Sequence, residues 1–238
     1  WSSDVCSSDL HRADQSGRGG GGQLGAFPSF LNSRLAWCTG WVCVALTAQA
    51  GNQVEEHLAD SVRTALSASV SGLPSPQPYL PTAKDQQAYE RWMTTQQSRL
   101  TARLKTWHGS SGLPELASAE QQRLFLQTLW YESHRAALDP SLVLGLVEVE
   151  SGFRKYAISS AGAMGVMQVM PFWPKLLGQK DASVLFQWQA NLRFGCVILR
   201  HYLKLEDGNL VMALGRYNGS RGQAAYPKAV LAAQQGWQ

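Results

Sequence analysis

The chain has 238 residues, of which 45% are hydrophobic and 16% charged, a size and composition that suit one globular domain with additional segments. The net charge of +4 is mildly basic and fits an anionic polymer or surface as partner. Basic residues are not clustered with interleaved aromatics, so we do not expect the protein to bind nucleic acid.

The first 50 residues are expected to precede the folded part of the protein. Residues 1–25 begin with WSSDVCSSDL, which resembles translated sequencing-adaptor sequence, and continue into a glycine-rich run, so we expect a non-native or disordered leader. Residues 26–50 have the form of a signal peptide: Arg34 precedes an apolar run over 35–47, and an A-x-A cleavage site ends at Ala50. A cleaved signal predicts a periplasmic or secreted protein, and a retained membrane anchor is the alternative.

Residues 51–115 are predicted to form a helical region that precedes the main domain. Apolar residues recur at every fourth position over 54–66, as on one face of a helix. The segment SGLPSPQPYLP is a proline-rich linker. A polar helix with a thin apolar stripe is expected over 84–107, and we favour a solvated arm over a helix that binds a partner.

Residues 116–238 are predicted to form one all-α domain. Ser118 and Gln121 have the spacing of a capping box at the start of a helix, and Asp139 followed by Pro140 marks the start of the next. A glycine-rich turn and a short helix are expected over 159–170, and further helices are expected within 181–205, 209–217 and 225–237.

Cysteine and histidine usage argues against disulfides and metals. Cys196 is the one cysteine that follows the predicted signal, so the mature chain is not expected to contain an internal disulfide. It lies in an apolar helical run, which favours a small buried hydrophobe over a nucleophile. The histidines lack the spacing of metal ligands, and no metal or cofactor is expected.

The segment LVLGLVEVESGFRK, residues 142–155, is an almost wholly apolar helix that ends on a carboxylate. Such a helix is expected to be buried on all sides. Gly145 within it costs about 1 kcal/mol relative to alanine, which indicates that another backbone passes close by. Gly152 is the expected residue just past the end of the helix.

The two glutamates of this segment are expected to differ in role. Glu150 lies in the last turn, where burial and the negative end of the helix dipole both raise the pKa of a carboxyl, as a general acid requires. Glu148 lies roughly 200° away around the helix and is predicted to pair with an arginine. From this stretch alone, a solvated residue at the end of the helix is an equally good interpretation of Glu150.

Two later segments carry groups suited to a polar ligand. GAMGVMQVMP combines small residues with the amide of Gln168 and the apolar side chain of Met170. RYNGS places Tyr217 and Asn218 at the end of a helix. Each pattern by itself is common in proteins.

Together, ESGF, AMGVMQVMP and RYNGS resemble the soluble lytic transglycosylases, lysozyme-like enzymes that cut bacterial peptidoglycan. The resemblance covers about residues 125–230 and implies a lysozyme-like, all-α SLT domain, similar to goose-type lysozyme and preceded here by additional helices. It implies that Glu150 is the catalytic glutamate. It also implies substrate-binding roles for Ser151, Gln168, Met170, Tyr217, Asn218 and Tyr226. One departure is Arg216, which stands where the family has alanine.

In that family one glutamate acts as both acid and base on the β-1,4 bond between N-acetylmuramic acid and N-acetylglucosamine, leaving a 1,6-anhydromuramic acid end. Ordinary glycosidases use two carboxylates. After Glu150 the remaining acids are expected at an N-cap, Asp181, and in a solvated turn, Glu206 and Asp207. Tyr217 is expected to orient Glu150, and Ser151, Gln168 and Asn218 are expected to bind polar groups of the sugar. Phe172, Trp173 and Tyr226 are candidate surfaces for stacking on sugar rings.

Two other functions remain open at this point. A hydrolase similar to lysozymes or endolysins would use water and leave reducing ends. A wall-binding accessory of a secretion or conjugation apparatus would need no catalysis. The expected partner is the glycan strand of peptidoglycan, with such an apparatus as a further candidate, and the protein is expected to be a monomer.

Overall fold

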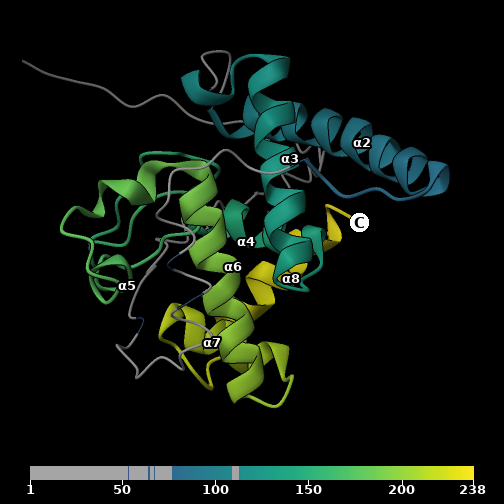
Figure 1. The fold of residues 1–238 in the computed structure, drawn as a ribbon. Coiled ribbons are helices and arrows are strands. Elements are labelled where there is room, and N and C mark those ends of the chain that lie inside the picture. Colours follow the sequence, from purple (N-terminus) through teal and green to yellow (C-terminus); the bar gives the residue numbers. More distant parts are fainter. Residues whose placement is uncertain (1–52, 54–63, 65–66, 68–76, 109–112) are drawn as a thin grey trace, which may run out of the picture. The chain divides into compact units, whose positions relative to one another are not determined.

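The computed structural model describes residues 53, 64, 67, 77–108 and 113–238, which are coloured in Figure 1. The expected leader and signal peptide, and most of the helix expected around residues 54–66, lie outside these ranges. The elements in chain order are α2 (Ala83–His108), the 3-10 helix η2 (Pro114–Leu116), α3 (Ala119–Arg135), α4 (Pro140–Ser151), α5 (Phe172–Lys175), the 3-10 helix η3 (Ala182–Phe186), α6 (Trp188–Leu205), α7 (Leu210–Asn218) and α8 (Ala225–Gln235). The predicted all-α fold is confirmed for the described part of the chain, where β-structure is limited to isolated bridges.

The apolar helix of the sequence is α4, and its ends are capped as predicted. The Asp139 carboxylate accepts a hydrogen bond of 2.8 Å from the backbone N–H of Ser141, and Pro140 occupies the first position. Gly152 ends the helix in the left-handed conformation, with φ of 56°. Almost every side chain between these caps is buried, so α4 is a central helix of the domain.

Gly145 allows α8 to pack directly against α4 (Figure 1). A Cβ atom at this position would lie 2.6 Å from the backbone nitrogen of Gln234. The predicted close approach of a second backbone is therefore confirmed. It matters for function because α4 and α8 each contribute one residue to the candidate site described below.

We expect Gly145→Ala to destabilise the fold by about 1–3 kcal/mol, because the new methyl group meets backbone atoms that cannot move independently. This loss should outweigh the gain of up to about 1 kcal/mol from the better helix propensity of alanine. Urea unfolding measures the difference. Ala232→Gly on the exposed side of α8 reports the propensity effect alone. A Gly145→Ala variant as stable as the parent would contradict the packing of α8 on α4.

Of the glycine-rich turn and short helix expected over 159–170, the structure forms the turn, and among the described residues no helix lies between α4 and α5. The backbone of the segment 157–171 forms turns joined by antiparallel bridges between Ile158 and Met164 and between Met164 and Val169. Gly165 and Gln168 have φ of 78° and 49°, which a right-handed helix does not allow. A Cβ atom at Gly165 would lie 2.3 Å from the carbonyl oxygen of Leu185, so only glycine fits. The predicted glycine-rich turn is therefore confirmed, and the predicted short helix is wrong because the turns continue through Gln168.

The polar helix α2 is not the solvated arm that we favoured. One face of it is buried, through Tyr89, Met93, Gln96, Leu100 and Leu104, and α2 packs against α3. The Gln96 side-chain amide also donates a hydrogen bond of 3.1 Å to the carbonyl oxygen of Trp237. The thin apolar stripe was therefore a packing face. No helix among the described residues is long and apolar enough to cross a membrane.

Candidate active site

Glu150 is buried at the end of α4, with 5% of its surface exposed. Burial raises the pKa of its carboxyl from 4.5 to about 8, and a hydrogen bond from Tyr226 opposes this rise. The predicted upward shift of the pKa is thus confirmed, with desolvation as its main cause. The interpretation of Glu150 as a solvated residue at the end of the helix is wrong.

Tyr226, from the first turn of α8, is the tyrosine that contacts the carboxyl of Glu150. Its hydroxyl donates a hydrogen bond to Oε1 of Glu150. Burial and the neighbouring Glu150 carboxyl raise the pKa of Tyr226 well above its usual value of 10, so the hydroxyl keeps its proton. This contact depends on the packing of α8 against α4, which joins residues 76 positions apart in the chain.

The expectation that Tyr217 orients Glu150 is corrected by this geometry. Tyr217 is buried in α7, and its hydroxyl donates a hydrogen bond of 2.8 Å to the carbonyl oxygen of Met167. Its ring lies close enough to Glu150 for the carboxyl to raise the pKa of Tyr217, although burial is the larger cause. Tyr217 therefore connects α7 to the 157–171 segment, and the hydrogen bond to the acid comes from Tyr226.

We expect Tyr226→Phe to lower kcat about tenfold, because a hydrogen bond to the carboxylate formed during the reaction is lost. The same bond lowers the pKa of Glu150, so its loss should raise that pKa and move the alkaline limb of the pH–rate profile to higher pH. Rates measured across pH 5 to 10 test both effects. Tyr217→Phe is the matched control, for which the alkaline limb should stay in place. An unchanged alkaline limb in Tyr226→Phe would argue against the contact.

Ser151 joins α4 to the 157–171 segment, and Gln168 forms hydrogen bonds within that segment. The Ser151 hydroxyl lies 2.8 Å from the carbonyl oxygen of Val166. The Gln168 side-chain amide donates to the carbonyl oxygens of Gly165 at 2.9 Å and Ala157 at 3.2 Å. Both side chains are buried. The structure therefore uses them to fix the segment beside Glu150, whereas the sequence predicted contacts with the sugar.

Met170 and Asn218 are half-buried, which leaves part of each side chain exposed. Asn218 accepts a hydrogen bond of 2.9 Å from the Ser220 hydroxyl.

The indole N–H of Trp173 donates a 2.7 Å bond to Gln53, whose side-chain oxygen also lies 3.4 Å from the backbone nitrogen of Met170. Trp173 is fully buried, so it is not a surface on which a sugar ring can stack. The other two candidates for stacking, Phe172 and Tyr226, are half-buried.

A second set of contacts joins the C-terminal part of α4 to α2 and to Trp237. Glu148 forms an ion pair of 2.5 Å with Arg103 of α2 and accepts a 2.6 Å hydrogen bond from the indole of Trp237. The predicted pairing of Glu148 with an arginine is confirmed. At the end of α2, Nε2 of His108 lies 2.9 Å from the carbonyl oxygen of Gly152. No local sequence pattern singles out Arg103, His108 or Trp237, because they meet α4 only through long-range packing.

The other acids that follow Glu150 in the chain are engaged elsewhere. Asp181 accepts a backbone hydrogen bond from Ser183 at the start of η3, as predicted for an N-cap. Glu206 was expected in a solvated turn, but it is buried and paired with Arg216 and Arg221, which lower its carboxyl pKa to about 2. The guanidinium group of Arg216 is therefore engaged in an ion pair with Glu206. In the described part of the chain, none of these acids pairs with Glu150.

A metal site is not found in this region. Among the described residues, histidines, cysteines and acids do not form a group of three or more that would hold a metal ion. Cys196 is buried, as predicted, and burial raises the pKa of its thiol.

Comparison with known proteins shows which proteins this part of the chain is similar to. Residues 129–235 match the family model described as the transglycosylase SLT domain. The chain is 38% identical over 114 residues to a transglycosylase of Enterobacteria phage PRD1, covering 43% of this chain and 42% of that protein. It is 38% identical over 85 residues to membrane-bound lytic murein transglycosylase C of Actinobacillus pleuropneumoniae serotype 5b, covering 32% of this chain and 23% of that protein.

The chain thus spans less than half the length of these relatives. Among solved structures, an inactive mutant of the lytic transglycosylase Slt from Pseudomonas aeruginosa aligns with a TM-score of 0.40 and 18% identity, covering 77% of this chain and 36% of that one.

Proposed function

We propose that this chain, whose residues 129–235 match the transglycosylase SLT domain model, is a peptidoglycan lytic transglycosylase. It would cleave the β-1,4 bond between N-acetylmuramic acid and N-acetylglucosamine and leave a 1,6-anhydromuramic acid end. The observation that carries the proposal is the buried Glu150, whose carboxyl has its pKa raised to about 8 and therefore holds its proton near neutral pH.

In the first step the protonated Glu150 gives its proton to the glycosidic oxygen. The bond from that oxygen to C1 of the muramic acid breaks, and N-acetylglucosamine leaves with a free hydroxyl. The positive charge that develops at C1 is stabilised by the N-acetyl group of the same sugar. Glu150 is now a carboxylate, and the Tyr226 hydroxyl donates a hydrogen bond to it.

In the second step the Glu150 carboxylate removes the proton from the C6 hydroxyl of the muramic acid. The C6 oxygen then bonds to C1 and closes the 1,6-anhydro ring. Glu150 returns to its protonated form, and no water is consumed. One carboxyl group is sufficient for both steps, in contrast to the two that ordinary glycosidases need. This agrees with the engagement of Glu206 and Asp181 away from Glu150.

Digestion of purified peptidoglycan in water enriched in ¹⁸O tests this proposal. A lytic transglycosylase yields anhydro-ended muropeptides without incorporated ¹⁸O. The alternative, a hydrolase similar to lysozyme, yields reducing ends that carry ¹⁸O at C1. Reducing ends as the main product would overturn the proposed reaction, and the absence of any cleavage would favour a wall-binding accessory.

The expected place of action follows from the proposed reaction. Because the substrate is the cell wall, the protein would act in the periplasm or after secretion, as the expected signal peptide also implies. The association with a secretion or conjugation apparatus and the monomeric state stay predictions from the sequence.

A further inference from the structure

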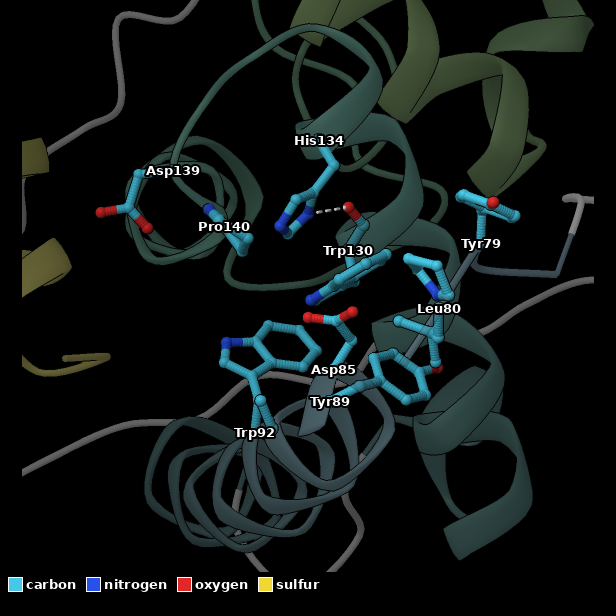
Figure 2. Close-up of a pocket in the computed structure, with 11 residues that line it drawn as sticks. Tyr79, Leu80, Asp85, Tyr89, Trp92, Trp130, His134, Asp139 and Pro140 are labelled. Carbon is cyan, nitrogen blue, oxygen red and sulfur yellow. Dashed lines mark hydrogen bonds between the residues drawn. The ribbon is translucent and has the colours of Figure 1, made fainter. Parts of the chain in front are cut away.

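A cavity of about 550 Å³ lies between the start of α2, the second half of α3 and the start of α4 (Figure 2). This volume is within the range of about 300–1,000 Å³ that is typical of small-ligand sites. The cavity reaches Asp139 and Pro140 at the first turn of α4. Glu150 is ten residues further along the same helix, a rise of about 15 Å, so the cavity is separate from the candidate active site. We call it the aromatic cavity.

Aromatic rings form much of the wall of the aromatic cavity. Tyr79, Tyr89, Trp92 and Trp130 all line it. The ring of Trp130 is held in place by the stacked ring of His134, with centroids 3.7 Å apart, and by the edge-on ring of Tyr89 at 5.1 Å. Trp92 and Trp130 are only half-buried, which leaves part of each ring accessible to a ligand.

Polar groups without partners lie among these rings. Figure 2 shows the Asp85 carboxylate next to the rings of Trp92 and Trp130. Its Oδ2 accepts hydrogen bonds from the backbone and hydroxyl of Thr82, at 3.2 and 2.6 Å, while its Oδ1 accepts none from the described residues. The indole N–H groups of Trp92 and Trp130 likewise find no acceptor in the described part of the chain. The polar groups that line the aromatic cavity therefore include this carboxylate oxygen as an acceptor and the two indole N–H groups as donors, beside flat apolar surfaces.

We propose that the aromatic cavity binds a saccharide unit of the peptidoglycan glycan, as a second contact with the wall that is separate from the cleavage site. The C–H face of a pyranose ring packs on an aromatic ring, and its hydroxyl and acetamido groups both donate and accept hydrogen bonds, which matches the faces, the free carboxylate oxygen and the indole N–H groups. A cationic ligand would use the rings and the carboxylate but would leave both N–H donors unpaired. The choice of glycan rests on the proposed function, whereas the saccharide class rests on the cavity itself.

Titration of the ¹⁵N-labelled full chain with N,N′,N″,N‴-tetraacetylchitotetraose tests the proposal directly. The Glu150→Gln background prevents cleavage. The indole N–H signals of Trp92 and Trp130, each assigned from its Trp→Phe variant, should shift with the same saturating dependence on the tetrasaccharide. Trp92→Leu should weaken the affinity reported by the Trp130 signal about tenfold, whereas Leu124→Ala, at an exposed site of α3 outside the cavity, should leave it unchanged. The measurement does not depend on catalysis, so a failure of the proposed reaction would leave it intact.

Asp85→Asn separates a saccharide from a cation. It keeps a side-chain oxygen but removes the charge, so we expect saccharide affinity to fall less than threefold. Indole signals that do not respond to the tetrasaccharide would overturn the proposal. So would signals that respond instead to a free stem peptide with an amino group, in a manner abolished by Asp85→Asn.

Discussion

Glu150→Gln is expected to lower kcat on purified peptidoglycan by a factor of about 10²–10⁴. Glutamine keeps the size and the hydrogen bond to Tyr226, but it cannot give a proton to the glycosidic oxygen or take one from the C6 hydroxyl. The loss should therefore appear in kcat while binding of the glycan persists. Release of soluble muropeptides over time measures the rate, and co-sedimentation with insoluble peptidoglycan measures the binding.

Asp207→Asn is the matched control for this charge removal. Asp207 is exposed and has φ of 48°, a conformation that asparagine tolerates well, so this variant should retain the parent rate. If wall-lysing activity survives Glu150→Gln while the variant protein is pure and folded, another residue is the acid and the proposed mechanism is wrong.

The second large effect of the same substitution concerns stability and depends on pH. The folded chain holds the carboxyl of Glu150 at a pKa of about 8, against a reference value of 4.5. Folding therefore favours the protonated form, and this contribution is fully present below pH 4.5 and is lost as the pH rises to 8. At pH 7 the parent protein should have lost on the order of 3 kcal/mol of unfolding free energy relative to a neutral side chain. Glutamine does not titrate, so Glu150→Gln should stabilise the protein at pH 7.

Urea unfolding of both proteins at pH 4.5, 7 and 8.5 measures this difference. The two stabilities should be similar at pH 4.5, and the variant should become progressively more stable as the pH increases. Contributions from other titrating groups, including Glu148, are common to both proteins and cancel in the comparison. A difference that stays constant over this pH range would show that the carboxyl of Glu150 titrates with an ordinary pKa.

Much of the fold could be predicted because the relevant signals are local. The capping box of Ser118 and Gln121, the cap formed by Asp139 and the terminating Gly152 each depend on a few neighbouring residues. The burial of α4 followed from its apolar composition on all sides. The glycine-rich turn of the segment 157–171 was predicted, but the short helix was predicted wrongly, because the backbone there depends on close contacts such as that of Gly165 with Leu185, which lies 20 residues further along the chain.

One part of the candidate site could be predicted from the sequence, and another part could not. The identity of the candidate acid was visible in the sequence, since Glu150 follows a buried helix and precedes its terminating glycine. The tyrosine that bonds to it was not, because two tyrosines, Tyr217 and Tyr226, had suitable positions in the chain. Their hydroxyls are distinguished only by the packing of α7 and α8, which directs one to Met167 and the other to Glu150.

By itself, the sequence determined that this protein has a buried helix ending on a carboxyl group, because apolar periodicity and helix caps are written in neighbouring residues. The tertiary structure alone decided which groups surround that helix. Arg103 and Trp237 donate hydrogen bonds to Glu148 from positions 45 and 89 residues away in the chain. Tyr226 of α8 donates a hydrogen bond to Glu150. These contacts depend on how α2 and α8 pack against α4. Gly145 indicates that some backbone lies close to α4, but which helix it is and which side chains it brings are properties of the whole core.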